Sequence, residues 1–427
     1  MSSPVSSWLP ALTPHRLRQV WYAPLLALAM GLMMVRLLVM ARLLDVAGFG
    51  AFSGGILVSS TFCMLGCLGL QSMLQREWPV RIVRRQERRA LVLAMQGWLV
   101  AAGCAFVAAV WLPILPWTGM SGTLLLVGVV HGLSQQVFLL ATVDRRSRGD
   151  AVGYAWQNLS RAGLAFVLSV LAAHLTASAL WALWVDAVAT FALAWRFFAH
   201  SLARAFTGAR GLTAIAMQRL PRVRWRSALT LMTIGIVGFV QLNVDRWLAA
   251  GRLDVSGFAQ YSFAWIVLSM AQSAQAVVGA LVHPALARRY AAHGSRVAFG
   301  TCLRASVALL VVGICAGLLL VPVLKQAAQY WYPGYGEAVG LIPLFLGIGV
   351  LRVSDFWSGF LIATGHEHRL LLVNVLAMAL ALVVWLYVAS SPRDSGGELL
   401  SVGWLAAFLS ALSYLGVVAA SWGIQKG

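Results

Sequence analysis

Long apolar segments separated by short polar loops make up most of this chain. Each segment of about 20 residues is long enough to cross roughly 30 Å of hydrocarbon as a helix. Helix is expected because backbone N–H and C=O groups in lipid must be satisfied within the segment, and the short alternating strands of a β-barrel are not seen in the pattern. The pattern predicts twelve transmembrane helices, at 21–42, 51–74, 90–112, 123–143, 151–173, 178–199, 227–249, 258–283, 297–324, 338–361, 370–389 and 399–422.

Composition agrees with this all-α polytopic pattern. Hydrophobic residues make up 60% of the 427, charged residues make up 11%, and the mean hydropathy is +0.82. A soluble domain needs more polar residues than this to cover its outside. The first apolar segment is too long for a signal peptide and has no A-x-A cleavage site after it, so it is expected to remain in the mature protein.

The net charge of +19 reflects how the chain is oriented in the membrane. With the N-terminus placed in the cytoplasm, 22 Lys and Arg residues fall in cytoplasmic tails and loops, and five fall on the other side. This bias predicts a multi-pass protein of a bacterial inner membrane with both termini cytoplasmic. The same placement removes the reason to expect a nucleic-acid partner, since the basic residues mark loops facing anionic membrane lipids.

The two halves of the chain repeat each other. ARLLDVAGFGAFS at 41–53 returns as AGRLDVSGFAQYS at 250–262, with seven of thirteen positions identical and an offset of 209 residues. Six predicted spans separate the copies, so the repeats are parallel and are expected to face each other around a central cavity. The predicted division is a cytoplasmic tail (1–20), a six-helix bundle (21–199), a basic cytoplasmic linker (200–226), a second six-helix bundle (227–422) and a short cytoplasmic tail (423–427).

Several segments resemble a known family. RLLDVAGFGAFS after the first helix is similar to an element of bacterial polysaccharide and O-antigen flippases, in the multidrug/oligosaccharidyl-lipid/polysaccharide exporter (MOP) superfamily. Three later segments also look like that family, at 243–264, 332–345 and 363–376. The chain departs from the family at Asp45–Val46, where Gly–Pro is usual, and in having twelve predicted spans in place of fourteen.

The resemblance implies a flippase for polyprenyl-diphosphate-linked oligosaccharide, which would serve surface polysaccharide synthesis without a cofactor. Glycan polymerases and glycosyltransferases would then be partners. The alternative within the superfamily is a drug or small-cation antiporter, which would want carboxylates where a diphosphate wants arginines. A membrane glycan polymerase or ligase is the other class, but every predicted outer loop is short and none holds an acid–base pair, so no catalytic residue is assigned.

Charged residues inside predicted spans are costly in lipid and are therefore candidates for function. The candidate substrate-binding cations are Arg36, Arg161, Arg246 and Arg352. The candidate coupling or gating acids are Asp186, Asp245 and Asp355. Arg352 and Asp355 lie three residues apart on one helix and could simply pair with each other. Arg36 and Asp245 occupy equivalent repeat positions, so they either meet across the cavity or lie separately at helix ends.

Other polar features favour ordinary structural roles. The five cysteines all lie in predicted helices without His or carboxylate partners, and His366-Glu367-His368 lies in a short loop without a third ligand, so no metal site is expected. The aromatic group Tyr330, Trp331, Tyr332 and Tyr335 is typical of a membrane-interface belt. Amides within the spans, such as Gln241 and Gln275, are expected to join helices, and a few of them to contact sugar hydroxyls.

Overall fold

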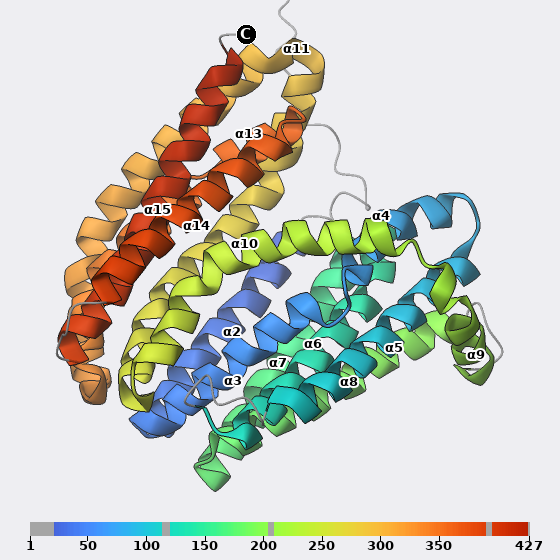
Figure 1. Ribbon diagram of the computed structural model, residues 1–427, viewed down its shortest axis with the longest axis horizontal. Coiled ribbons are helices and arrows are strands. Elements are labelled where there is room, and N and C mark those ends of the chain that lie inside the picture. The colour runs from blue at the N-terminus through green and yellow to red at the C-terminus, as the bar shows by residue number, and fades with distance from the viewer. Residues whose placement is uncertain (1–20, 113–119, 204–208, 390–394, 426–427) are drawn as a thin grey trace, which may run out of the picture.

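The computed structural model describes residues 21–112, 120–203, 209–389 and 395–425, and these ranges fold into helices joined by short connections. Eleven of the described helical segments are long and apolar enough to cross a membrane. The remaining predicted span, 258–283, forms the first part of helix α11 (Val255–Trp331). That helix contains a break at Gly294, with φ 77° and ψ −174°, and Figure 1 shows the chain reversing direction there. The chain is therefore an all-α, multi-pass membrane protein.

The described residues of the N-terminal half form seven helices. They are α2 (Tyr22–Leu43), α3 (Val46–Leu65), α4 (Leu70–Val83), α5 (Glu87–Trp111), α6 (Gly122–Ser147), α7 (Ala151–Thr176) and α8 (Ala179–Ala203). The predicted span 51–74 is wrong as a continuous helix, because the chain breaks between α3 and α4. Gly69 lies in the left-handed region there, with φ +81°, and a Cβ at this position would lie 1.9 Å from the carbonyl oxygen of Ala228. Only glycine allows this close approach of two backbones.

The C-terminal half has the corresponding set of helices. After α10 (Trp225–Arg252) and α11 come the short 3-10 helix η3 (Pro333–Tyr335), α12 (Ala338–Val353), α13 (Trp357–Ala363), α14 (Glu367–Ala389) and α15 (Ser395–Gln425). The predicted span 338–361 is likewise two helices. The Asp355 carboxylate accepts hydrogen bonds from the backbone N–H and the hydroxyl of Ser358, at 3.1 and 2.6 Å, which stabilises the start of α13.

The repeated segments form an equivalent helix cap in each half. Asp45 caps α3 by accepting a hydrogen bond from the N–H of Gly48, and Asp254 caps α11 by accepting one from the N–H of Gly257, both at 2.9 Å. A Cβ at Gly48 or Gly257 would lie 2.5 or 2.9 Å from the capping oxygen, so glycine is needed beside each cap. These paired caps account for identities on which the predicted duplication depended, and the two six-helix repeats are confirmed.

The linker between the halves contains structure that the sequence pattern did not predict. Helix α9 (Ala209–Arg219) and the 3-10 turn η2 (Leu220–Arg222) follow α8. Leu212 and Ala216 of α9 are fully buried in the core cluster that includes α5, and the Gln96 amide of α5 donates a 3.3 Å hydrogen bond to the carbonyl of Ala216. The linker is therefore attached to the N-terminal half, in addition to carrying the basic residues expected to face lipid.

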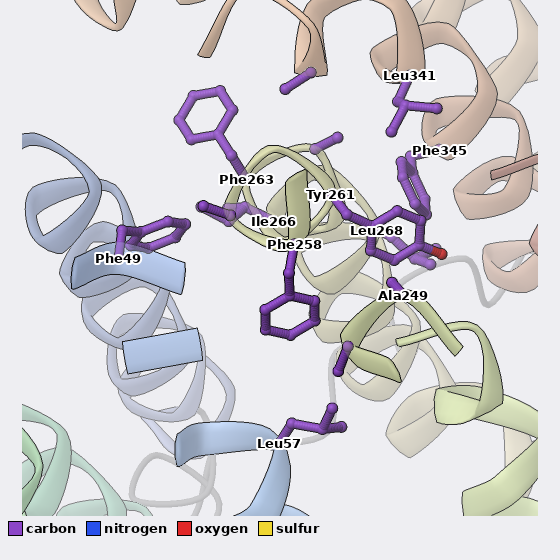
Figure 2. Packing of buried hydrophobic residues seen from close by; sticks show 14 of the residues in the cluster. Phe49, Leu57, Ala249, Phe258, Tyr261, Phe263, Ile266, Leu268, Leu341 and Phe345 are labelled. Carbon is purple, nitrogen blue, oxygen red and sulfur yellow. The ribbon is translucent and has the colours of Figure 1, made fainter. Parts of the chain in front are cut away.

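The two halves meet at one end and diverge toward the other (Figure 1). At the end that holds the repeated segments, one apolar core includes residues of both halves, and Figure 2 shows Phe49 and Leu57 of α3 beside Phe258 and Ile266 of α11. The approach is close: a Cβ at Gly50 would lie 2.4 Å from the carbonyl oxygen of Val255. This end of the molecule is closed.

Two tyrosines of the predicted aromatic belt help to close this end. The hydroxyl groups of Tyr332 and Tyr335 donate to the carbonyl oxygens of Leu38 and Ala41 on α2, at 3.3 and 3.2 Å. Tyr330 and Trp331 are exposed, as a membrane-interface position requires. The four aromatic residues thus divide into a pair that joins the halves and a pair that faces outward.

The opposite end carries the arginine-rich loops. Arg148, at the end of α6, bonds the Glu87 carboxylate at the start of α5 at 2.9 Å, and Arg224 before α10 pairs with Glu77 of α4. These contacts gather the loops around 84–89, 145–148 and 219–226 at one end of the bundle. This is the end that the charge bias predicts to be cytoplasmic.

Candidate functional site

A cavity of about 510 Å³ lies between the halves toward the arginine-rich end. Its walls come from α2, from the connection between α6 and α7, from the first half of α7, and from Ser273 of α11. Three methionines of α2, Met30, Met33 and Met34, form part of its apolar wall. The polar side chains that line it are those of Tyr22, Arg146, Tyr154, Asn158, Arg161 and Ser273.

Arg161 is the cation of this cavity that lies deepest along the membrane-spanning helices. It is half-buried, and its guanidinium lies over the ring of Phe138 with 5.2 Å from Cζ to the ring centroid. Among the described residues it has neither an ion-pair nor a hydrogen-bond partner. No Asp or Glu lines the cavity in the part of the chain that the structure describes. A charged side chain at membrane depth without a protein counter-ion is a candidate for binding a partner from outside.

Arg36, in contrast, has a counter-ion within its own half. It is 2% exposed and forms an ion pair with Asp186 of α8, which is 0% exposed. Asp186 also accepts hydrogen bonds from His131 Nε2 at 2.8 Å and from the Thr190 hydroxyl at 3.1 Å. Because an ionised carboxylate only accepts, Nε2 carries a proton.

His131 extends this network to a fourth helix. Its Nδ1 lies 2.7 Å from the hydroxyl of Ser59 on α3, so α2, α3, α6 and α8 are joined through one buried polar cluster. His131 itself is 3% exposed. It was not among the predicted site residues, although an ionisable residue in the middle of the predicted span 123–143 was the available signal. The cluster neutralises both Arg36 and Asp186 and fixes the packing of the N-terminal half.

Asp245 and Arg246 of α10 lie near the closed end. Asp245 accepts a 2.6 Å hydrogen bond from the Tyr261 hydroxyl, and Arg246 lies over the Trp265 ring, 4.3 Å from Cζ to the centroid. Arg246 also donates a long hydrogen bond, of 3.4 Å, to the carbonyl oxygen of Ser53 in the other half. Among the described residues, no ion pair joins Asp245 to Arg36. Their predicted meeting stays a prediction for another access state, because each has a partner in its own half here.

Arg352 and Asp355 line a separate cavity of about 250 Å³ inside the C-terminal half. Their predicted pairing with each other is absent from the ion pairs of the described residues, and Asp355 instead caps α13. Arg352 Nη1 is buried and has no hydrogen-bond partner in the described part of the chain. The structure thus divides the seven predicted site residues among an inter-half cavity (Arg161), a buried network (Arg36 and Asp186), the closed end (Asp245 and Arg246) and a second cavity (Arg352 and Asp355).

The chain was compared with known proteins. No protein-family model matches the sequence, and no curated protein matches it. Among solved structures, a eukaryotic MATE transporter superposes with a TM-score of 0.62 at 12% identity, covering 94% of this chain and 95% of that one. A multidrug resistance MATE family transporter of the MOP superfamily, in an inward-facing conformation, gives 0.59 at 16% identity, covering 95% and 96%.

A third solved structure is a MOP superfamily transporter from Pyrococcus furiosus, described by a reverse polarity of its binding pocket that suggests a different function for that protein. It gives a TM-score of 0.55 at 15% identity and covers 96% of each chain. Together these likenesses show that the chain has the fold of MATE transporters of the MOP superfamily, with two six-helix repeats.

Proposed function

We propose that this protein is an alternating-access transporter, and not an enzyme, and that its inter-half cavity accepts an anionic amphiphile. The observation that carries the proposal is Arg161, a cation without a protein partner in a cavity that no described carboxylate lines. In such an environment an acid group gains a strong charge-assisted hydrogen bond, whereas a cation meets only repulsion. Closure at one end and a cavity toward the other are the features of one access state of a transporter.

The lining suits a phosphate group joined to a lipid chain. A guanidinium binds phosphate oxygens through two parallel hydrogen bonds, and Arg146 supplies a second cation at the exposed rim. Tyr22, Tyr154 and Asn158 add neutral donors. Met30, Met33 and Met34 supply a flexible apolar wall, which adapts to an irregular chain. Among lipids that carry a phosphate group, we propose a polyprenyl-diphosphate-linked oligosaccharide, because this is the substrate that the resemblance to polysaccharide flippases implies.

This substrate implies where the protein lies, in which direction it transports and which enzymes are its partners. The protein would lie in a bacterial inner membrane with both termini cytoplasmic, and would move the glycolipid from the inner to the outer leaflet for surface polysaccharide synthesis. The enzymes that build and polymerise the glycan would be its partners. The arginine-rich end supports this orientation, because such loops stay on the cytoplasmic side.

The second candidate is a drug or small-cation antiporter. Two observations favour it: solved proteins of this fold are described as multidrug resistance transporters, and an apolar cavity of about 680 Å³ lies between α3, α5, α6 and Trp247 of α10. A cationic drug also needs a carboxylate, and Asp186 is committed to Arg36 and His131 in this state. The cavity charge therefore makes the anionic substrate our first choice.

Binding to the purified protein in lipid nanodiscs separates the two candidates. We expect a short-chain prenyl diphosphate to bind the wild type, and Arg161→Ala to weaken this binding about tenfold or more, as loss of a hydrogen bond to a charged group does. Arg161→Lys should recover part of it, because an ammonium keeps the charge without the planar fork. Arg196→Ala, which changes an exposed arginine outside the cavity, is the matched control. Binding of a lipophilic cation in place of the diphosphate would favour the antiporter.

A further inference from the structure

The second polar cavity, inside the C-terminal half, belongs to no part of the site described so far. It has a volume of about 250 Å³ and is enclosed by α10, α11, α12 with α13, α14 and α15. Arg352 and Asp355 line it, together with amides and hydroxyls from α10, α11, α14 and α15. The uncharged side chains on which the argument rests are those of Gln241, Gln275, Asn374, Ser410 and Ser413.

This lining has more hydrogen-bonding capacity than the protein uses. The Gln241 amide donates to the Ser413 hydroxyl, which in turn donates to Asn374 Oδ1 at 2.9 Å. That arrangement leaves the carbonyl oxygen of Gln241 and the amide nitrogen of Asn374 without partners among the described residues. Gln275 and the buried Arg352 Nη1 are also unpaired there. A buried donor without a partner, such as Arg352 Nη1, is costly, and the partly exposed amides of Gln241, Gln275 and Asn374 are free to bond an occupant that both donates and accepts.

Formal charge narrows the class of occupant. The lining holds one arginine and one aspartate, whereas the described lining of the inter-half cavity holds two arginines and no acid. The charge of Asp355 opposes an anion and that of Arg352 opposes a cation. Hydroxyl groups avoid both conflicts, because each donates to an acceptor and accepts from a donor. A ring that carries several hydroxyl groups, as a sugar residue does, matches this lining.

Helix α11 places the two cavities at nearly the same depth. Ser273 lines the inter-half cavity and Gln275 lines the second one. Two residues along an α-helix correspond to about 200° of rotation and roughly 3 Å of rise, so these side chains leave opposite faces of α11. The cavities are therefore separated by about the thickness of one helix.

We propose that the cavity bounded by Gln241, Asn374, Ser410 and Arg352 binds a sugar residue of the transported glycolipid that lies several units along the glycan, while the inter-half cavity binds its diphosphate. This rests on the proposed function, since it names the part of the substrate that each cavity recognises. The C-terminal half thereby selects the glycan by hydrogen bonding, and the N-terminal half selects the lipid-linked acid group by charge.

The experiment compares two kinds of probe on the same purified protein in nanodiscs: a short-chain prenyl diphosphate, and the same diphosphate carrying a linear tetrasaccharide of glucose or of N-acetylglucosamine, which is long enough to pass around a helix. We expect at least one sugar-bearing probe to bind the wild type about tenfold more tightly, which corresponds to one or two net hydrogen bonds. Gln241→Ala and Asn374→Ala should remove this increment and leave the affinity for the bare diphosphate unchanged. Arg161→Ala should weaken binding of every probe.

Two further variants keep the result interpretable. Ser410→Leu fills the cavity without touching the hydrogen-bonded chain of Gln241, Ser413 and Asn374, so it should abolish the increment even if the amide variants fold poorly. Asn243→Ala, two residues from Gln241 on α10 and outside the cavity lining, should change nothing. Equal binding of bare and sugar-bearing probes, or an increment that survives Ser410→Leu, would overturn the sugar site alone. Absence of binding by any diphosphate would overturn the proposed function, and the sugar site with it.

Discussion

The buried ion pair between Arg36 and Asp186 offers the sharpest test of the packing described here. Both side chains are almost completely inaccessible, and Asp186 additionally holds His131 and Thr190. Replacing Asp186 by Asn keeps the shape of the side chain and removes its charge, which leaves the Arg36 guanidinium buried without a counter-ion. Removing one partner of such a pair costs about 3–5 kcal/mol. We expect Asp186→Asn, or Arg36→Met, to lower the free energy of unfolding by an amount in that range.

The double variant separates the pair from its surroundings. Because Arg36→Met together with Asp186→Asn leaves no charge unpaired, its loss should fall short of the sum of the single losses by roughly 3 kcal/mol. The assay is unfolding in mixed micelles of a mild detergent and sodium dodecyl sulfate, followed by tryptophan fluorescence. Arg36→Met combined with Asp245→Asn is the matched cycle for the symmetry-related pair, and should be additive within about 0.5 kcal/mol in this conformation. Additivity for Arg36 with Asp186, or strong coupling for Arg36 with Asp245, would refute the reasoning.

Three smaller predictions follow from close backbone approaches and from the linker. Gly69→Ala should destabilise the protein far more than Gly149→Ala, since both positions have positive φ but only a Cβ at Gly69 meets a backbone oxygen. Thermal denaturation of the two variants in detergent checks this. Equal losses of thermal stability would argue against the contact with Ala228. Gly50→Ala should weaken closure at the repeated segments and raise cysteine labelling at Ala259→Cys, a buried position beside Gly50. Unchanged labelling would show that this contact does not hold the end closed. Leu212→Asp should detach α9 from α5 and speed proteolysis within 209–222, because it buries an unpaired charge, and a cleavage rate equal to that of the wild type would contradict the docking.

Hydrophobic patterning was sufficient for most of the fold. Lipid imposes a length and a helical backbone on every crossing, so apolar segments of about 20 residues translate directly into spans. The two predicted spans that are broken have local causes that periodicity does not register. One is the left-handed Gly69 pressed against Ala228, and the other is the cap that Asp355 provides to α13.

The candidate site was less predictable, since the role of each charged residue depends on whether it is ion-paired in the folded protein. The free-energy cost of a charged side chain in lipid marked Arg36, Asp186 and Arg161 equally well as candidates for function. Arg36 and Asp186 are 150 positions apart in sequence, and no local pattern indicates that they meet and neutralise each other. Repeat symmetry suggested Asp245 as the partner of Arg36, but Tyr261 satisfies Asp245 within its own half. Only the three-dimensional packing shows that, among the described residues, Arg161 has neither an ion-pair nor a hydrogen-bond partner in the inter-half cavity.

Transport by the reconstituted protein tests the central claim most directly. Proteoliposomes would hold a fluorescent, short-chain prenyl diphosphate glycolipid, and its exposure to an impermeant quencher would report movement between leaflets. The account predicts rapid exchange with the wild type, strong loss with Arg161→Ala, and unchanged exchange with Arg196→Ala. Exchange that does not depend on Arg161, or its absence in vesicles that do exchange a lipophilic cation, would contradict an anion-selective cavity.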